Sequence, residues 1–172
     1  MGEELKILFS QKEIAQTVAR LAREISADYA NKRVVLIGVL KGAFVFLADL
    51  VRQLTIPVEI DFMRIASYGS QKESSGEIKV TKEVEVPLEG KDVLIIEDIV
   101  DTGLSLKFLV DHIYAQGPSS LKICALIDKK SRREVEIQVD YIGFEMEEGF
   151  IVGYGIDFDE RYRYLPEIFV VN

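Results

Sequence analysis

The segment from Val93 to Ser105 carries the residues of this chain that are best suited to chemistry. An apolar run leads into two adjacent carboxylates, Glu97 and Asp98, which can accept hydrogen bonds from the vicinal hydroxyls of a sugar. A small loop from Asp101 to Ser105 follows, and a helical pattern begins after it. Backbone amides at a helix start bind phosphate, because they point at the anion and the helix dipole favours negative charge. The spacing therefore predicts a site for a sugar phosphate.

A simpler interpretation of these acids is structural. Asp98 or Asp101 could cap the following helix while the other carboxylates are solvated. However, adjacent carboxylates repel each other and need a compensating partner, and a cap would use only one of the three acids. The pair Glu97 and Asp98 therefore favours a bound ligand or metal ion.

Two further candidates lie near the C-terminus. Asp157 could hold magnesium, which is satisfied by one or two carboxylates together with phosphate oxygens, or it could be a surface acid paired with Arg161 or Arg163. Phe150 could be a core residue or a face on which a base stacks. Both interpretations stay open for each residue.

The elements that would position these residues are strands that alternate with helices. Apolar runs are typical of strands at 34–40, 57–65, 92–96, 121–127 and 139–144. Ser10 and Glu13 form a capping-box pattern ahead of a helical stripe, and similar stripes follow the first and third strands. This alternation predicts an α/β fold with a mostly parallel, twisted sheet flanked by helices. The tail from Phe150 onward predicts an irregular or β appendage over one edge of the sheet.

Three of the expected strands end in polar residues. Lys41-Gly42 follows the first strand, the acidic segment follows the third, and Asp128-Lys129-Lys130 follows the strand that contains Cys124. Ligands of open α/β sheets bind beyond the carboxyl ends of the strands. We therefore expect these groups to converge on one crevice.

The segment from Ser67 to Gly76 is polar, rich in serine and glycine, and without periodicity. It could be a solvated hairpin loop. It could also be a mobile lid, because long loops in compact domains are often functional.

Length and composition narrow the class of protein. A chain of 172 residues without low-complexity tracts predicts a single domain. The 21 basic and 29 acidic side chains leave a net charge of −8, which disfavours a nucleic-acid partner. No apolar stretch approaches the roughly 20 residues of a membrane span, and the N-terminus has no secretion-signal pattern. We expect a cytoplasmic protein without a membrane partner, in which the single cysteine is buried and reduced.

The motifs resemble those of the 6-oxopurine members of the type I phosphoribosyltransferase family. IIEDIVDTG is similar to the family's phosphoribosyl pyrophosphate (PRPP) motif, and three other segments match in order: GVLKGAFVFLADL, SYGSQKESSGEIKV and VDYIGFEMEEGFIVGYGIDFDERYRYLP. The resemblance runs from about Val34 to Pro166. It implies one phosphoribosyltransferase domain over residues 1–172, with a core at about 10–144 and a hood formed mainly by 145–172 with the N-terminal residues.

The resemblance also implies an activity and its partners. The family's 6-oxopurine enzymes transfer the 5-phosphoribosyl group of PRPP to hypoxanthine or guanine, which gives the purine nucleotides IMP or GMP and pyrophosphate. They use Mg2+ as cofactor. By likeness we expect a purine salvage enzyme that forms a homodimer or a homotetramer.

Residue roles follow from the resemblance position by position. Glu97 and Asp98 would bind the ribose hydroxyls, directly or through magnesium and water, and Asp101 would act as general base at nitrogen 7 of the purine. The residues expected to bind the ribose phosphate are Glu97, Asp98, Asp101, Thr102, Gly103, Leu104 and Ser105. Leu104 departs from the polar or basic residue often found there in related loops, but its backbone amide can still serve.

The other expected contacts lie at the pyrophosphate and base ends. The expected pyrophosphate-binding residues are Lys41, Gly42 and Arg163, and the family has a cis peptide before the lysine. The expected purine-binding residues are Lys129 (to the 6-oxo group), Phe150 (stacked), Ile151 (through its backbone) and Asp157. Ser67 and Tyr68 would belong to a closing lid, and the expected metal ligands are Asp157, Glu97 and Asp98.

Two alternatives belong to other classes. A PRPP-binding transcriptional regulator of the same fold would bind nucleic acid, but the acidic net charge and the presence of Lys129, Phe150 and Asp157 argue against it. A Rossmann-like methyltransferase could use the acids as a ribose clamp. Its cofactor loop should be rich in glycine after the first strand, and Lys41-Gly42 does not supply that.

Overall fold

The computed structural model describes residues 4–68 and 77–172. The large sheet is built from β2 (Val34–Val39), β3 (Val58–Tyr68), β4 (Glu77–Lys82), β5 (Asp92–Val100), β6 (Ser120–Lys129) and β7 (Tyr141–Met146). The small sheet is built from β1 (Leu5–Phe9), β8 (Ile151–Val152) and β9 (Ile168–Val171). The helices of the described residues are α1 (Gln11–Asp28), α2 (Phe44–Val51) and α3 (Leu104–Tyr114).

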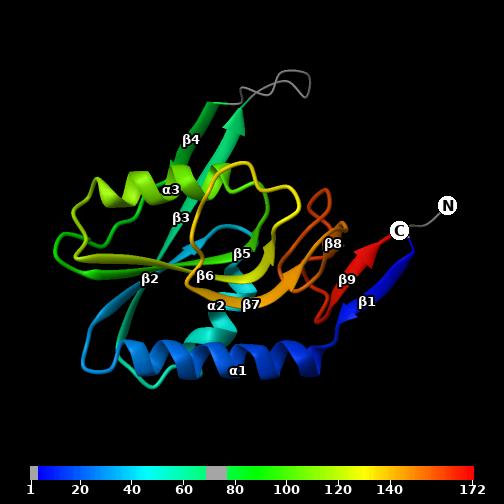
Figure 1. Ribbon diagram of the computed structural model, residues 1–172, viewed down its shortest axis with the longest axis horizontal. Coiled ribbons are helices and arrows are strands. Elements are labelled where there is room, and N and C mark those ends of the chain that lie inside the picture. Colours follow the sequence, from blue (N-terminus) through cyan, green and yellow to red (C-terminus); the bar gives the residue numbers. More distant parts are fainter. Residues whose placement is uncertain (1–3, 69–76) are drawn as a thin grey trace.

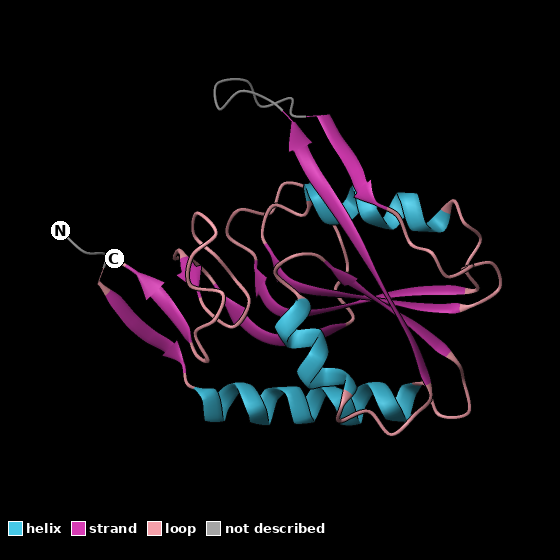
Figure 2. Ribbon diagram, turned by 180° about the vertical axis from the view of Figure 1, so that it is seen from behind, coloured by secondary structure: helices cyan, strands magenta, loops and turns pink. Residues whose placement is uncertain are grey.

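The large sheet has the order β4-β3-β2-β5-β6-β7 and is parallel except at one edge. Strand β3 pairs in parallel with β2, and β2, β5, β6 and β7 continue in parallel. Only β4 runs antiparallel, next to β3, and these two strands project from the rest of the sheet (Figures 1 and 2). The expected α/β class with a mostly parallel sheet is confirmed.

Helices cover both faces of this sheet, and two hydrophobic cores result. All six residues of β2 are buried, and they alternate between the cores. Val34 and Leu36 face α1 and α2, whereas Val35 and Ile37 face α3. Figure 1 shows α3 on one side of the sheet and α1 and α2 on the other. The continuous apolar run of this strand reflects burial on both faces.

Helix α1 begins as its sequence predicts. The Ser10 hydroxyl accepts a hydrogen bond from the Glu13 amide at 3.3 Å, and the Glu13 carboxylate accepts one from the Ser10 amide at 2.8 Å. Such a cap is worth about 1 kcal/mol. The buried stripe of the helix then packs into the first core through Ile14, Val18 and Leu21.

Strand β5 is longer than the sequence predicted. It was expected to end at Ile96, but it runs on to Val100, because Glu97, Ile99 and Val100 pair with residues of β6. The acidic pair therefore lies inside the strand and not in the loop after it. This boundary is set by the residues of β6 that pair with β5, and those residues are distant from β5 in the sequence.

The C-terminal tail forms a small sheet with the N-terminal residues. Strand β9 pairs with β1, with Leu5 opposite Val171, and also with β8. Figure 1 shows this sheet beyond the carboxyl ends of β5, β6 and β7. The ring of Phe9, at the end of β1, stacks on Phe144 of β7 at 3.9 Å. The sequence had predicted an irregular or β appendage at the C-terminus but not the strand β1.

The segment expected to be a hairpin loop or a lid is described only at its start. Ser67 and Tyr68 end strand β3, and they pair with Ile78 and Glu77 of β4. Residues 69–76, which link the two strands, lie outside the described residues. Within the described ranges, no helix is long and apolar enough to cross a membrane.

Candidate active site at the carboxyl ends of the strands

The sheet order brings three polar strand ends together. Strands β2, β5 and β6 are neighbours, and they lead into Lys41-Gly42, the loop 101–105, and Lys129, respectively. The carboxyl ends of parallel strands open on the same edge of a sheet. The convergence expected from the sequence is therefore present in the fold.

The acidic pair is partly buried and strained electrostatically. The Asp98 amide donates to Glu97 Oε1 at 3.2 Å, and the Ile99 amide donates to Asp98 Oδ1 at 2.7 Å. Burial, and then the charge of Asp98, raise the pKa of Glu97 well above its usual range. Burial also raises the pKa of Asp98, although hydrogen bonds and the charge of Arg163 oppose this. A bound cation or a set of hydroxyl donors would reduce the repulsion between the two carboxylates and compensate for their burial.

The turn after β2 lies directly against this pair. The peptide bond between Leu40 and Lys41 is cis, as the resemblance implied. A Cβ placed on Gly42 would come within 1.8 Å of Asp98 Oδ2, and a Cβ on Gly155 within 2.3 Å of the Gly42 carbonyl oxygen. Three segments from distant parts of the chain therefore meet at Gly42, and larger side chains would not fit there.

The loop after β5 lines a small pocket. The pocket has a volume of about 140 Å³ and is lined by Glu97, Ile99, Val100, Asp101, Thr102, Gly103, Ser105 and Leu106. Gly103 precedes the first residue of α3 with a φ of 85°, a left-handed conformation that favours glycine. Helix capping by Asp98 or Asp101 is therefore wrong. The Leu104 amide donates to Thr102 Oγ1 at 3.3 Å, and the Leu104 side chain is exposed at the helix start.

The two carboxylate oxygens of Asp101 differ: one contacts an arginine, and the other has no partner among the described residues. Its Oδ2 lies 3.2 Å from Arg132 Nη1. Its Oδ1 is buried and accepts no hydrogen bond from any described residue. A buried acceptor without a donor is costly, so Oδ1 is suited to receive a donor from a ligand.

The base end of the site combines a buried ammonium with an exposed ring. Lys129 is 8% exposed, and its Nζ donates to the carbonyl oxygen of Gly149 at 3.0 Å. Phe150 is 49% exposed and meets the ring of Phe158 edge-on, with 5.2 Å between the centroids. The core interpretation of Phe150 is thus wrong, and the ring is accessible for stacking. Ile151 is buried in β8.

Arg163 links the C-terminal turn to the same region. Its Nη2 lies 3.0 Å from Asp157 Oδ1, and its Nη1 donates to the Gly155 carbonyl oxygen at 2.8 Å. Glu160, which sequence reasoning did not single out, bridges Arg163 at 3.3 Å and Lys41 at 3.0 Å. The hydrogen bonds from Lys41 and Arg163 lower the pKa of Glu160. Asp157 therefore has an arginine partner, as one of its two interpretations required.

The described residues contain no cluster of three or more histidine, cysteine or acidic side chains that could hold a metal ion. They do contain the carboxylate pair Glu97 and Asp98, whose pKa values are raised by burial and, for Glu97, also by the charge of Asp98. Magnesium commonly binds one or two carboxylates and takes its other ligands from water and substrate phosphates. The pair therefore fits magnesium bound together with a phosphorylated ligand.

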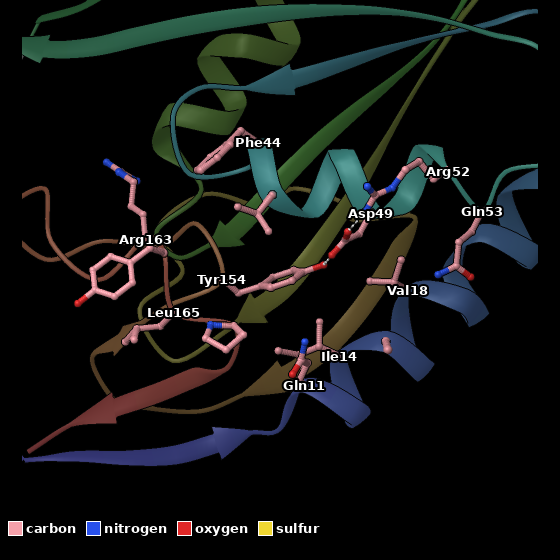
Figure 3. Close-up of a pocket in the computed structure, with 14 residues that line it drawn as sticks. Gln11, Ile14, Val18, Phe44, Asp49, Arg52, Gln53, Tyr154, Arg163 and Leu165 are labelled. Carbon is pink, nitrogen blue, oxygen red and sulfur yellow. Dashed lines mark hydrogen bonds and ion pairs between the residues drawn. The ribbon is translucent and has the colours of Figure 1, made fainter.

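A larger pocket of about 610 Å³ lies elsewhere, between α1, α2 and residues 163–166. Figure 3 shows Tyr154 and Asp49 joined by a hydrogen bond inside it, with apolar side chains such as Ile14 and Val18 along α1. The pocket contains neither the acidic pair nor the loop 101–105. Arg163 lies at its edge (Figure 3), so the two regions meet there. Volume alone would have pointed away from the chemistry.

Two arginines that sequence reasoning missed also reach the loop. Arg132 contacts the Asp101 carboxylate, and Arg133 Nε donates to the Asp101 carbonyl oxygen at 3.0 Å. Arg133 also binds Asp128 Oδ1. The only sequence signal was a pair of adjacent arginines soon after the expected strand, and their spacing does not show what they contact.

Comparison with known proteins gives one consistent result. The sequence model of the family described as "Phosphoribosyl transferase domain" matches residues 4–159. The hypoxanthine-guanine phosphoribosyltransferase of Aquifex aeolicus is 44% identical over 172 residues, which cover 99% of this chain and 97% of that protein. That of Bacillus subtilis is 45% identical over 167 residues, covering 97% and 93%. A crystal structure of the Bacillus anthracis hypoxanthine-guanine phosphoribosyltransferase superposes with a TM-score of 0.93 at 45% identity, and covers 98% of this chain and 100% of that one.

Proposed function

The chain belongs to the phosphoribosyltransferase family, and we propose that it is a purine salvage enzyme that transfers the 5-phosphoribosyl group of PRPP to hypoxanthine and guanine. The products are IMP or GMP and pyrophosphate. One observation carries this proposal most directly. The carboxylate pair lies on β5 and a small pocket is lined by the loop that follows it. The neighbouring strand β6 ends in the buried Lys129, and the exposed ring of Phe150 directly precedes β8.

The ribose phosphate is held by β5 and the loop that follows it. Glu97 and Asp98 accept hydrogen bonds from the two ribose hydroxyls, directly or through a cation. The 5-phosphate lies at the start of α3, where the amides from Asp101 to Ser105 and the hydroxyls of Thr102 and Ser105 are donors. Leu104 contributes its amide and not its side chain. The positive end of the helix favours the charge of the phosphate.

Asp101 acts as general base. Its Oδ1 is buried without a hydrogen-bond donor among the described residues, so it can accept the proton from nitrogen 7 of the purine. Nitrogen 9 of the same imidazole ring then forms a bond to the anomeric carbon, and the bond from that carbon to pyrophosphate breaks. Positive charge develops on the ribose in this step, and the neighbouring carboxylates stabilise it.

The leaving group is held by the turn after β2 and by the C-terminal segment. Lys41, Gly42 and Arg163 bind pyrophosphate, for which Lys41 and Arg163 must exchange their contacts with Glu160. Magnesium, when bound, neutralises the charge of the departing pyrophosphate. The residues proposed to hold it are Glu97, Asp98 and Asp157, and the last of these pairs with Arg163 in the structure.

Lys129 and Phe150 select the base. The Lys129 ammonium can only donate, so it favours a 6-oxo group over a 6-amino group. It donates to the Gly149 carbonyl oxygen at 3.0 Å, and a 6-oxo group would share or replace this acceptor. Phe150 stacks on the purine, and Ile151 meets the base edge through its backbone. Ser67 and Tyr68 belong to the segment that would exclude water, which competes with the purine as nucleophile.

The proposal extends to assembly and location. We propose a homodimer or homotetramer in the cytoplasm, with PRPP and a 6-oxopurine as substrates.

Pyrophosphate release tests the function. The purified protein is mixed with PRPP and magnesium, and turnover is measured with hypoxanthine, guanine, xanthine and adenine in parallel. Hypoxanthine and guanine should give turnover, and adenine should give little. No release with hypoxanthine or guanine would refute the proposal.

A further inference from the structure

A short segment after β6, residues 130–135, connects the two ends of the proposed site; we refer to it as the bridge segment. At the base end, the Ser131 hydroxyl donates to the Glu147 carbonyl oxygen, and Lys130 pairs with Glu145 at 2.7 Å. At the phosphate end, the amide of Glu134 donates to the Thr102 carbonyl oxygen at 2.9 Å. The segment thus touches the loop 101–105 without being part of it.

Arg133 is a largely buried side chain of the bridge segment at the phosphate end. Its Nη2 binds Asp128 Oδ1, and its Nε donates to the Asp101 carbonyl oxygen at 3.0 Å. The Asp128 side chain is only 3% exposed and that of Arg133 is 18% exposed. Gly103 packs closely against this arginine, because a Cβ there would come within 3.2 Å of Arg133 Cδ. A charge pair with this little solvent has a well-defined geometry and is costly to break on one side only.

The contact with Asp101 matters because of what that residue does in the proposed reaction. The loop amides bind phosphate only if they point into the pocket, and the Asp101 carboxylate must face the purine. Both orientations depend on the backbone of residue 101, whose carbonyl oxygen Arg133 holds. Displacing a catalytic group by about 1 Å can cost around 100-fold in rate.

We propose that Arg133, anchored by the buried Asp128, is a positioning residue that keeps the loop 101–105 in its phosphate-binding conformation. This inference rests on the proposed function, and it adds a residue pair outside the expected site. Arginine is required because its planar guanidinium donates in two directions at once, to Asp128 and to Asp101. A lysine could keep the charge pair but not both contacts.

The test compares Arg133→Lys and Arg133→Ala with a control, Glu136→Ala, at an exposed position of the same stretch of chain. Melting temperature, kcat, and the KM for PRPP and for hypoxanthine are measured for each. Arg133→Lys should fold and melt close to the parent, yet lose about tenfold in kcat/KM for PRPP, the size expected for one hydrogen bond from a charged group. The preference between hypoxanthine and guanine should not change. Arg133→Ala should show the same kinetic defect with a lower melting temperature.

Unchanged kcat/KM for PRPP in Arg133→Lys would overturn the positioning role, and so would a loss confined to melting temperature in Arg133→Ala. Calorimetric binding of ribose 5-phosphate, without a purine base, separates this inference from the proposed function. One outcome would contradict the proposed function alone: the parent binds ribose 5-phosphate, Arg133→Lys binds it more weakly, and neither protein turns over any purine. Equal binding by the parent and Arg133→Lys, or no binding by the parent, overturns the positioning role.

Discussion

Gly42 and Asp98 are in direct contact, although 56 positions separate them in the chain: a Cβ on Gly42 would come within 1.8 Å of Asp98 Oδ2. This contact seats the turn after β2 against the acidic pair of β5. The proposed pyrophosphate-binding and ribose-binding groups are therefore adjacent because no side chain stands between them.

Replacing Gly42 by alanine should damage the site more than the fold. The methyl group must displace either the Asp98 carboxylate or the turn, so we expect a loss of roughly 100-fold in kcat/KM for PRPP. The measurement is steady-state kinetics with thermal melting. Gly90→Ala is the control, because a Cβ on Gly90 meets open space; unlike Gly42, Gly90 has a positive φ, of 71°. The control should lose about 1–2 kcal/mol of stability and keep its kinetics; equal kinetic losses in both variants would contradict the prediction.

Asp101→Asn should slow the reaction and largely spare PRPP binding. Asparagine has the shape of aspartate but cannot accept the purine proton, and general-base catalysis is worth about 100-fold or more. The substitution also weakens the exposed contact with Arg132, which should lower the free energy of unfolding only slightly. Single-turnover rates report the chemical step, and calorimetry reports PRPP binding. Equal losses in both would show that Asp101 serves binding and not proton transfer.

Lys129→Ala should relax selection between 6-oxo and 6-amino purines. The variant removes the ammonium that donates to the Gly149 carbonyl oxygen and that would meet the 6-oxo group. Turnover of hypoxanthine should fall by about tenfold or more, the worth of a charged hydrogen bond, and discrimination against adenine should shrink. Lys130→Ala removes the next lysine, which is exposed and bound to Glu145, and should leave selectivity unchanged. If Lys129→Ala discriminates against adenine as well as the parent does, this assignment is lost.

Asp61 should make stability depend on pH on the acid side. Burial would raise the pKa of this carboxyl, but hydrogen bonds from the amides of Val86, Phe62 and Glu85, with the charge of Lys82, outweigh it and hold the pKa below its usual range. A group with a lowered folded pKa stabilises the protein above its unfolded pKa of about 3.9, and this contribution is lost as the pH falls through the folded value.

The corresponding variant is Asp61→Asn, studied by urea unfolding at pH 7 and at stepwise lower pH. At pH 7 the variant should be less stable by about 1–3 kcal/mol, because one of the two side-chain oxygens that accept the amides of Phe62, Glu85 and Val86 becomes a donor group. The difference in the free energy of unfolding between the parent and Asp61→Asn should narrow as the pH falls below about 4. Glu59→Gln, on the same strand and exposed, is the control and should change stability by less than about 1 kcal/mol. A constant difference between Asp61→Asn and the parent across this range would argue against the role of the charge.

Local features of the fold were predictable from sequence. The capping box of Ser10 and Glu13 and the apolar stripe of α1 depend on residues three or four positions apart, so short-range spacing determines them. The buried strands β2 and β6 were visible as apolar runs, because both of their faces are covered. The short strands β1 and β9 were not visible in this way. Leu5 pairs with Val171, and neither short segment shows on its own that it has a partner.

By itself, the sequence determined the class of fold and which residues are candidates for the chemistry, since carboxylates, amides and a helix start are properties of local composition. Only the tertiary structure decided how these groups meet. The continuation of β5 to Val100 depends on pairing with β6, and the contact of Gly42 with Asp98 depends on the order of strands. Arg133 reaches Asp101 because the bridge segment folds back over the loop. Contacts between residues distant in sequence depend on the packing of the whole chain, so the spacing of residues along the sequence does not predict which pairs meet.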